Sequence, residues 1–410
     1  DYSLGGWYRS ANLISFMQAT RRVFERVVTS ASKDEMSVVV SSRAHQSKEQ
    51  WTLRKVLRRA AWHEREHMTT LRRYVRQYRL ESQAQDRPPQ ESIDRAKLRR
   101  ILSWKTELVQ LTTSSINPKD RPMYAKELAR ILTDETRDSL ERRAAADALN
   151  FVGDPRITQL RPEMAKIPAA RSKVGISEER ARELANEAGL PSHAFRVETP
   201  ERVVELPDYR ISRYLVTNME YLKFLRETGR KSPSWWSGTV VGPSFLPWKA
   251  NHPVWGVSWD DAVSYCEWLS KKSGTTYRLP HETEWEKASR GTDGRDYPWG
   301  DRFLEDRCNT AEAKIRGTTS VGVYPNGASP FGLMDMAGNV EEWTLDSPNS
   351  RNSNLGERSL FLLTQEYKIT KGSGWRDGWY TARCSFRRIR GKSYDIDAGG
   401  RIGFRLASEG

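Results

Sequence analysis

The segment 331–343 limits the possible folds more than any other part of the chain, because it sets a tight polar turn between apolar anchors. The apolar candidates for the core are Leu333, Met334 and Met336, and the dipeptide Gly338-Asn339 is typical of a turn. Side-chain oxygens occur within eight residues, as a hard cation would require, at Asp335, Asn339, Glu341 and Glu342. Two interpretations stay open: a cation-binding turn, or a strand, a turn and a solvated acidic tail.

Further motifs flank this segment in a fixed order. They are 255–268 (WGVSWDDAVSYCEW), 277–288 (YRLPHETEWEKA), 297–300 (YPWG) and the closing 402–405 (IGFR). Taken together, residues 162–410 resemble the formylglycine-generating enzyme (sulfatase-modifying factor) family. The resemblance implies a C-type-lectin-like domain with small twisted sheets, few helices and long ordered loops. The expected fold class is α+β, with this C-terminal domain preceded by an all-α N-terminal region.

Length and composition set broad limits. A chain of 410 residues is long enough for two or three domains. No apolar run approaches the roughly 20 residues that span a bilayer, so no membrane contact is expected. Three cysteines are too few and too scattered for a disulfide framework or a zinc cluster, which makes the cytoplasm the simplest location. Because residue 1 is Asp rather than Met, a removed signal peptide stays open as an alternative.

The net charge of +14 belongs mostly to the N-terminal part. Residues 1–170 hold 32 Lys and Arg against 21 Asp and Glu, whereas residues 171–410 hold 35 against 32. This basic region indicates an acidic partner or nucleic acid, or simply an Arg-rich solvated helical surface.

The first expected region, 1–86, is helical. Residues 10–36 and 50–81 have apolar residues near helical spacing, and 51–67 resembles the end of a DinB-like four-helix bundle. His63 and His67 lie four residues apart on one helix face, as a pair of iron ligands would. DinB-like enzymes take a further His from an earlier helix, and residues 1–44 contain none. A packed or solvated His pair is therefore the expectation, and an iron site is the alternative.

The second expected region, 90–160, consists of helices over 93–114, 123–132 and 139–151, and 140–156 resembles one HEAT-type repeat. One repeat cannot bury its own face, so it must pack against its neighbours. In the third region, 162–410, strands are predicted over 163–168 and 203–214. Helices are predicted over 176–189, with Ser177 as the N-cap, and over 219–228, capped by Thr217-Asn218.

In the enzyme family, a cysteine pair after a Gly-Gly-Ser motif binds copper and activates oxygen, and thiolates suit that soft metal. Here the motif is Gly372-Ser373-Gly374, Asp377 stands at the position of the first cysteine, and none follows at the required spacing. Cys384 aligns better with a buried position, where a lone Cys is usually a small hydrophobe. Formylglycine generation is therefore rejected, and neither copper nor iron is expected as a cofactor.

Two other branches of the family offer alternatives. One couples a DinB-like iron domain to this fold and makes carbon–sulfur bonds, as in sulfoxide synthases; this branch and a copper oxidase are the enzyme alternatives. The other keeps the fold without catalysis, as in the variable proteins of diversity-generating retroelements, whose hypervariable region ends in Gly-Phe-Arg. Mutagenesis of Asn codons there cannot yield Trp, Lys, Glu, Gln or Met. These five types make up 84 of 410 residues, so about six are expected in 376–403, where only Trp379 and Lys392 occur. An ordinary enzyme relative with an Arg-rich final hairpin accounts for the segment equally well.

The sequence thus predicts a non-catalytic display protein that binds a protein or a small-molecule ligand through aromatic anchors and adaptable polar residues. The predicted contact residues are Trp375, Arg376, Asp377, Trp379, Tyr380, Ser385, Arg387, Arg388, Arg390, Tyr394, Asp395 and Asp397.

The resemblance also implies structural calcium. Asp335 and Glu342 with the carbonyls of Gly338 and Val340 match the second calcium site of the family, and Asn309 and Thr310 match part of the first, which lacks a carboxylate at 321–323. The expected role of the ion is to fix loops.

Overall fold

The computed structural model describes residues 39–41, 50–52, 92–103, 113, 115–191, 193–239, 242–244, 247–348, 367–392 and 401–410. The chain divides into two compact units, Asp1–Pro89 with Asn117–Lys119, and Gln90–Ile116 with Asp120–Gly410. In the first unit, β1 (Val39–Ser41) and β2 (Gln50–Thr52) form an antiparallel pair. The helix predicted to begin at residue 50 is therefore wrong at its start, where aromatic and β-branched residues favour a strand. The helix predicted over 10–36 and the pair His63 and His67 lie outside the described residues.

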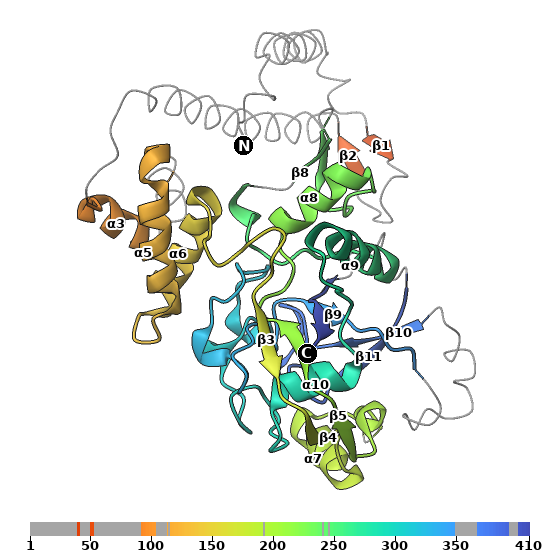
Figure 1. The fold of residues 1–410 in the computed structure, drawn as a ribbon. Coiled ribbons are helices and arrows are strands. Elements are labelled where there is room, and N and C mark those ends of the chain that lie inside the picture. Colours follow the sequence, from red (N-terminus) through yellow and green to blue (C-terminus); the bar gives the residue numbers. More distant parts are fainter. Residues whose placement is uncertain are drawn as a thin grey trace. The chain divides into compact units, whose positions relative to one another are not determined.

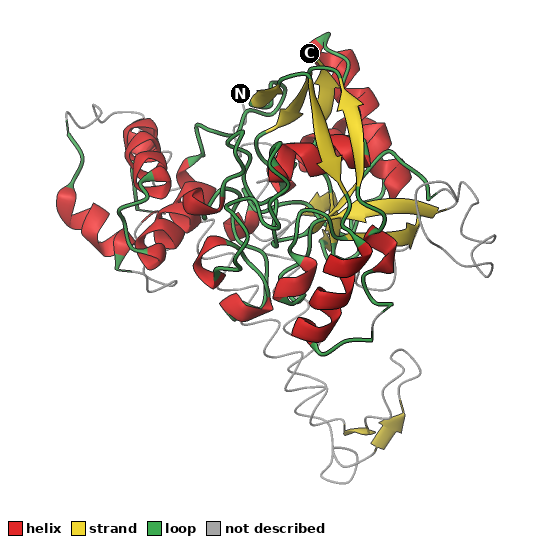
Figure 2. Ribbon diagram, turned by 90° about the horizontal axis from the view of Figure 1, so that it is seen from below, coloured by secondary structure: helices red, strands yellow, loops and turns green. Residues whose placement is uncertain are grey.

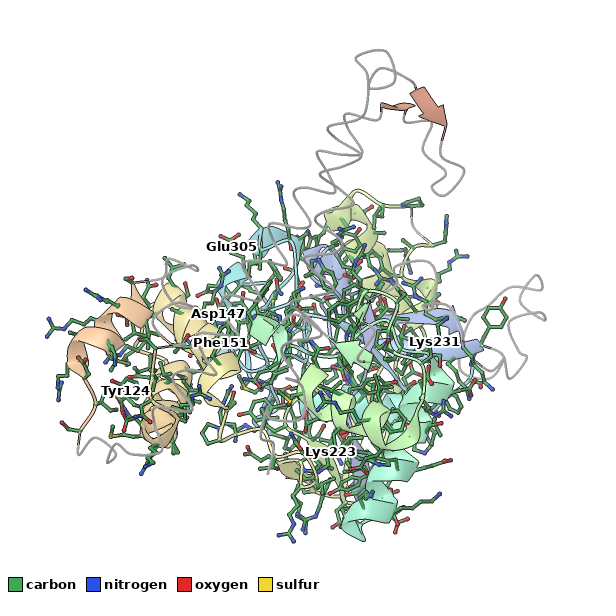
Figure 3. The ribbon with its side chains drawn as sticks, turned by 90° about the horizontal axis from the view of Figure 1, so that it is seen from above. Tyr124, Asp147, Phe151, Lys223, Lys231 and Glu305 are labelled. Atoms are coloured by element: carbon green, nitrogen blue, oxygen red, sulfur yellow. The ribbon has the colours of Figure 1, made fainter. Side chains whose placement is uncertain are left out.

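The second unit begins with three helices, α3 (Arg95–Leu102), α5 (Arg121–Thr133) and α6 (Ser139–Val152), which lie side by side in Figure 1. The predictions for α5 and α6 are confirmed. α6 begins where the Asp138 side chain accepts the Leu140 N–H at 2.6 Å, and Gly153 ends it. Its alanines are fully buried and allow close packing. In Figure 3, Tyr124 lies on α5, and its hydroxyl accepts the Asp94 N–H at 3.0 Å.

These helices do not form a core by themselves. Val323 and Tyr324, from a loop of the C-terminal part, complete their hydrophobic cluster. Asn150 near the end of α6 donates to Ser320 Oγ at 3.1 Å and accepts the Asn251 N–H at 2.7 Å. The prediction that the single repeat must pack against its neighbours is confirmed.

The remaining strands form small sheets, as the fold class predicts. β11 (Arg387–Gly391), β10 (Tyr367–Lys371), β9 (Glu341–Trp343) and β12 (Ile402–Gly403) make a four-stranded sheet in that order, antiparallel except for β9 with β12. β13 (Ala407–Glu409), β6 (Tyr209–Ser212) and β3 (Met164–Ile167) make a second sheet. β4 (Ala170–Val174) pairs with β5 (Arg202–Leu206), and β7 (Ser237–Thr239) pairs with β8 (Gly242–Ser244). Long loops, drawn in green in Figure 2, connect these elements.

Among the described residues, four further α-helices begin at capping residues. They are α7 (Glu178–Ala188), α8 (Asn218–Thr228), α9 (Trp259–Ser273) and α10 (Glu282–Arg290). Ser177 caps α7 and Thr217 caps α8, which confirms both predictions. Short 3₁₀ helices are η4 (Pro118–Asp120), η5 (Arg196–Glu198), η6 (Pro247–Lys249), η7 (Glu305–Arg307), η8 (Ala311–Ala313), η9 (Pro325–Gly327) and η11 (Trp379–Thr381). No helix in the described parts of the chain is both long and apolar enough to cross a membrane.

The largest core is aromatic and joins α8, α9 and the closing strands. Its rings include Tyr221, Phe224, Tyr265, Trp268, Trp343 and Phe404. The segment 331–343 supplies further core residues, since Leu333, Met334 and Met336 are buried as predicted. Its turn is also confirmed, with Gly338 and Asn339 in the left-handed region at φ 83° and 68°. The interpretation of its end as a solvated acidic tail is wrong, because Glu341 and Glu342 are buried in β9.

Candidate functional site

The loop that follows β10 holds Asp377 in a fixed place. Gly372 starts this loop in the left-handed region at φ 67°, and the Gly374 N–H donates to Asp377 Oδ2 at 2.8 Å. The backbone of Asp377 is held as well, because its carbonyl accepts the Ala311 N–H at 3.0 Å. Next to it, the Trp379 N–H donates to Glu312 Oε1 at 2.9 Å. The loop is therefore tied to η8 by two hydrogen bonds.

The Asp377 carboxylate is paired with the guanidinium of Arg388, from β11. Arg388 Nη2 lies 3.1 Å from Asp377 Oδ1, and Nη1 lies 3.2 Å from Oδ2. The same Nη1 is 2.8 Å from Glu341 Oε2, and Arg390 also binds Glu341, through Nε at 3.0 Å. Burial disfavours the charge of Arg388, but attraction to Glu341 and Asp377 outweighs burial and raises its pKa. Two cations and two carboxylates thus form one network across β9, β11 and the loop.

No thiol lies in this network. Cys266, Cys308 and Cys384 are all free and buried. Burial raises the pKa of Cys308 and of Cys384 to about 12, and it also raises the pKa of Cys266, so all three are neutral thiols. Cys384 Sγ accepts a hydrogen bond from Ser289 Oγ at 3.0 Å. The prediction of a buried Cys384 is confirmed, and these residues do not fit the two-thiolate copper site that the resemblance implies.

The structure places the predicted contact residues in three groups. Arg376 is exposed, and Asp377, Trp379, Tyr380, Arg388 and Arg390 are half-buried. Trp375, Ser385 and Arg387 are buried. Tyr394, Asp395 and Asp397 lie outside the described residues.

The predictions for Ser385 and Arg387 as surface contacts are wrong. Ser385 Oγ donates to Glu198 Oε2 at 2.7 Å, and Arg387 Nε lies 3.0 Å from Glu282 Oε1. Arg383 in the same segment is fully buried and pairs with Glu198 as well. The buried carboxylates on η5 and α10 need these partners, and a surface position would leave them unpaired.

Trp375 belongs to a row of three indoles. Trp235 stacks on Trp255 with ring centres 4.7 Å apart and planes within 7°, and Trp255 meets Trp375 edge to face at 5.3 Å. Arg401 lies over Trp375 at 5.3 Å, and Lys249 lies over Trp235 at the other end.

The second predicted calcium set does not fit a cation well. Both carboxylate oxygens of Glu342 accept hydrogen bonds from Arg405, at 2.7 and 2.9 Å. Asp335 Oδ2 accepts the Gly322 N–H at 2.7 Å, and burial raises the pKa of Asp335 to about 6. The strongest oxygen ligands of this set are therefore already engaged.

The first predicted set fits better. Asn309 is buried, and its Oδ1 has no hydrogen-bond donor. Thr319 Oγ1 and Asn326 Oδ1 are buried oxygens without partners in the same part of the domain. Oxygens of this kind are what calcium coordinates, and they are costly when unpaired. Calcium at Asn309 and Thr310 stays a prediction. Within the described residues, no group of three His, Cys, Asp or Glu side chains could hold a metal.

Comparisons with known proteins identify the family. The family model of the sulfatase-modifying factor enzyme 1-like domain matches residues 154–410, more than half of the chain. The chain therefore belongs to this family, and its C-terminal domain has the C-type-lectin-like fold of the formylglycine-generating enzymes.

The proteins similar to this chain include one named as an enzyme, one named as inactive and one named as a variable protein. The chain is 30% identical over 275 residues to the formylglycine-generating enzyme of Thermomonospora curvata, covering 52% of this chain and 86% of that protein. It is 28% identical over 262 residues to the inactive C-alpha-formylglycine-generating enzyme 2 of Bos taurus, covering 52% and 80%. A solved structure, Treponema denticola variable protein 1, matches with a TM-score of 0.46 and 18% identity over 60% of this chain and 95% of that one.

Proposed function

We propose that this protein binds a ligand at the surface around the 374–380 loop and does not oxidise it. One observation carries the proposal: Asp377 stands where the family reaction needs its first thiolate, and this carboxylate is bound by Arg388 and by the Gly374 N–H. A carboxylate cannot replace a thiolate in two-thiolate copper chemistry. The bovine relative is itself named inactive, so the family includes proteins described as lacking the activity.

The exposed part of this surface supports binding. Arg376 extends into solvent, and Trp379 and Tyr380 are half-buried rings on a loop that is tied to η8. Rigid aromatic side chains with an adjacent Arg are frequent anchors of binding surfaces, because little side-chain entropy is lost when they bind.

The buried ion pairs limit how far this segment can vary. Replacing Arg383 or Arg387 would leave Glu198 or Glu282 as a buried unpaired carboxylate, which costs several kcal/mol. A retroelement variable region, as the sequence suggests, would be restricted among the described residues to positions such as Arg376 and Tyr380. A neighbouring reverse transcriptase gene and a near-copy of residues 370–405 rich in Asn codons would support that origin, and variation at Arg383 would contradict it.

Selection from a displayed peptide library tests the proposed surface. Clones selected on the full chain should bind the Arg376→Ser variant at least about tenfold more weakly. Arg182→Ser, which removes an exposed Arg from α7, is the matched control and should leave binding unchanged. Equal binding of the selected clones to both variants would count against the loop as the binding surface.

A further inference from the structure

We infer that Lys368 and Lys392 form a binding site for a compact oxyanion beside the indole of Trp259, at the far end of the β10–β11 hairpin from Asp377. The inference goes beyond the proposed function, because this site lies apart from the surface around the 374–380 loop. The chemistry is that of a phosphate, sulfate or carboxylate group.

The ammonium groups of Lys368 and Lys392 both lie close to the indole ring of Trp259. Lys368 Nζ lies 4.1 Å from the centre of the Trp259 ring, and Lys392 Nζ lies 5.1 Å from it, so the two cations are less than about 10 Å apart. The ring is fixed from both sides, because Trp259 Nε1 donates to the Thr344 carbonyl at 2.8 Å and its backbone N–H donates to the Lys392 carbonyl at 3.0 Å.

The strand pairing explains why the two lysines meet. Lys368 on β10 lies opposite Arg390 on β11. Lys392 directly follows Gly391, which pairs with Tyr367 at the end of the two strands, so both lysines lie at this end of the pair.

Lys368 is an incompletely paired buried cation. Its residue is 7% exposed, and among the described residues its ammonium makes a single hydrogen bond, to the Leu345 carbonyl at 3.3 Å. Within the described part of the chain, no carboxylate lies within 4 Å of either lysine ammonium. Lysines are almost never buried to this degree unless they are paired, because a buried charge is costly without a partner.

The charge of Lys392 disfavours the charged form of Lys368. Burial lowers the pKa of Lys368 most, and the charge of Lys392 lowers it further, while Asp346 and Asp260 oppose this more weakly. Asp346 is already engaged, since its Oδ1 lies 3.1 Å from His281 Nδ1 and its Oδ2 accepts the Glu282 N–H. An added anion would offset the repulsion between the two lysines.

A compact oxyanion suits this geometry. It can accept a charge-assisted hydrogen bond of about 2.7–2.9 Å from each ammonium. Trp259 is also the first residue of α9, whose N-terminal end carries a partial positive charge. Stacking on an aromatic ring does not by itself create such a site. Lys249 lies over Trp235 at 5.3 Å, with no second cation over that ring among the described residues, and provides the matched control.

Calorimetric titration of the full chain with inorganic phosphate, sulfate and acetate tests the site. Saturable binding is expected, and Lys368→Met and Lys392→Met should each weaken phosphate binding at least about tenfold, whereas Lys249→Met should not. Lys392 is half-buried, so its variant keeps the test valid where Lys368→Met fails to fold. If acetate binds as tightly as phosphate and sulfate, the ligand group is a carboxylate. If phosphate or sulfate binds more tightly than acetate, the ligand group is an ester of that acid.

A second measurement follows the lysines themselves. After reductive ¹³C-methylation, phosphate should raise the pKa of the Lys368 and Lys392 amines, because a bound anion stabilises their charged forms. No saturable binding of any of the three anions, or equal loss in Lys249→Met, would overturn the inference. Oxygen-dependent turnover would overturn the proposed function alone and leave anion binding unaffected, so the two failures are distinguishable.

Discussion

Arg405 and Glu342 form a fully buried ion pair, with Arg405 Nε 2.7 Å from Glu342 Oε2 and Nη2 2.9 Å from Oε1. Arg405 also donates to the carbonyls of Ser212 and Met334, at 3.1 and 2.9 Å. The closing Gly-Phe-Arg motif is therefore tied to β9, to β6 and to the turn at 334. Arg405 is the partner of the Glu342 carboxylate.

Replacing Arg405 with Met should destabilise the domain by about 3–5 kcal/mol, because Glu342 would remain as a buried charge without a partner. Denaturant unfolding measures the loss. Arg213→Met is the control, since Arg213 and Glu163 form an exposed pair at 2.9 Å and such pairs contribute at most about 1 kcal/mol. Equal losses in the two variants would contradict this account of the buried pair.

The hydrogen bonds of Asn150 should stabilise the packing of α6 against the C-terminal part of the chain. Its replacement with Ala removes the acceptor of the buried Asn251 N–H and the bond to Ser320, and should cost about 1–3 kcal/mol. Asn186→Ala, at an exposed position of α7, should change the unfolding midpoint little. Equal unfolding midpoints for the two variants would contradict this prediction, because they would show that α6 packs independently of residues 251 and 320.

Stability should fall as pH rises from about 4.5 to 7, because of Glu220. Burial raises the pKa of Glu220 to about 7, and hydrogen bonds from Thr217 offset this only in part. Between the unfolded pKa of about 4.3 and the folded value, the folded chain keeps a proton that the unfolded chain releases. The loss is on the order of 3 kcal/mol.

Unfolding at pH 5 and pH 8 measures this effect. Glu220→Gln keeps an acceptor for Thr217 and should reduce the pH dependence, although Asp147 and Asp335, with pKa values also raised to about 6 by burial, contribute in the same direction. Glu227→Gln on the same helix is the control, because its pKa is lowered by Lys272. An unchanged pH dependence in Glu220→Gln would show that another group is responsible.

Removal of calcium should lower the melting temperature of the C-terminal domain. The expected ligand is the unpaired Oδ1 of Asn309, so Asn309→Leu should melt at the same temperature with and without a chelator. Differential scanning calorimetry in excess calcium and in chelator measures both. A wild-type melt that does not respond to chelation would exclude a stabilising calcium ion.

Local features of the fold could be predicted from the sequence because they are encoded by neighbouring residues. Ser177 and Thr217 cap their helices as predicted, and α5 and α6 match their expected ranges within two residues. The position of Asp377 follows from a motif of a few residues. Each of these features depends on hydrogen bonds or spacing within one or two turns.

The interior partners of the last segment could not be predicted. Arg383 and Glu198 are 185 residues apart in the sequence, and Ser385 and Glu198 are 187 apart. Arg is usually a surface residue, so composition alone favours exposure. The contact of Lys368 and Lys392 with one indole depends on the register of β10 and β11, which the sequence leaves open.

The most direct measurement of the central claim is oxygen consumption by the purified chain with a cysteine-containing peptide and copper, with the Thermomonospora curvata enzyme as the positive control. The account predicts no consumption above the rate without protein, because Asp377 cannot supply the thiolate. Oxygen uptake coupled to conversion of the peptide cysteine would contradict it.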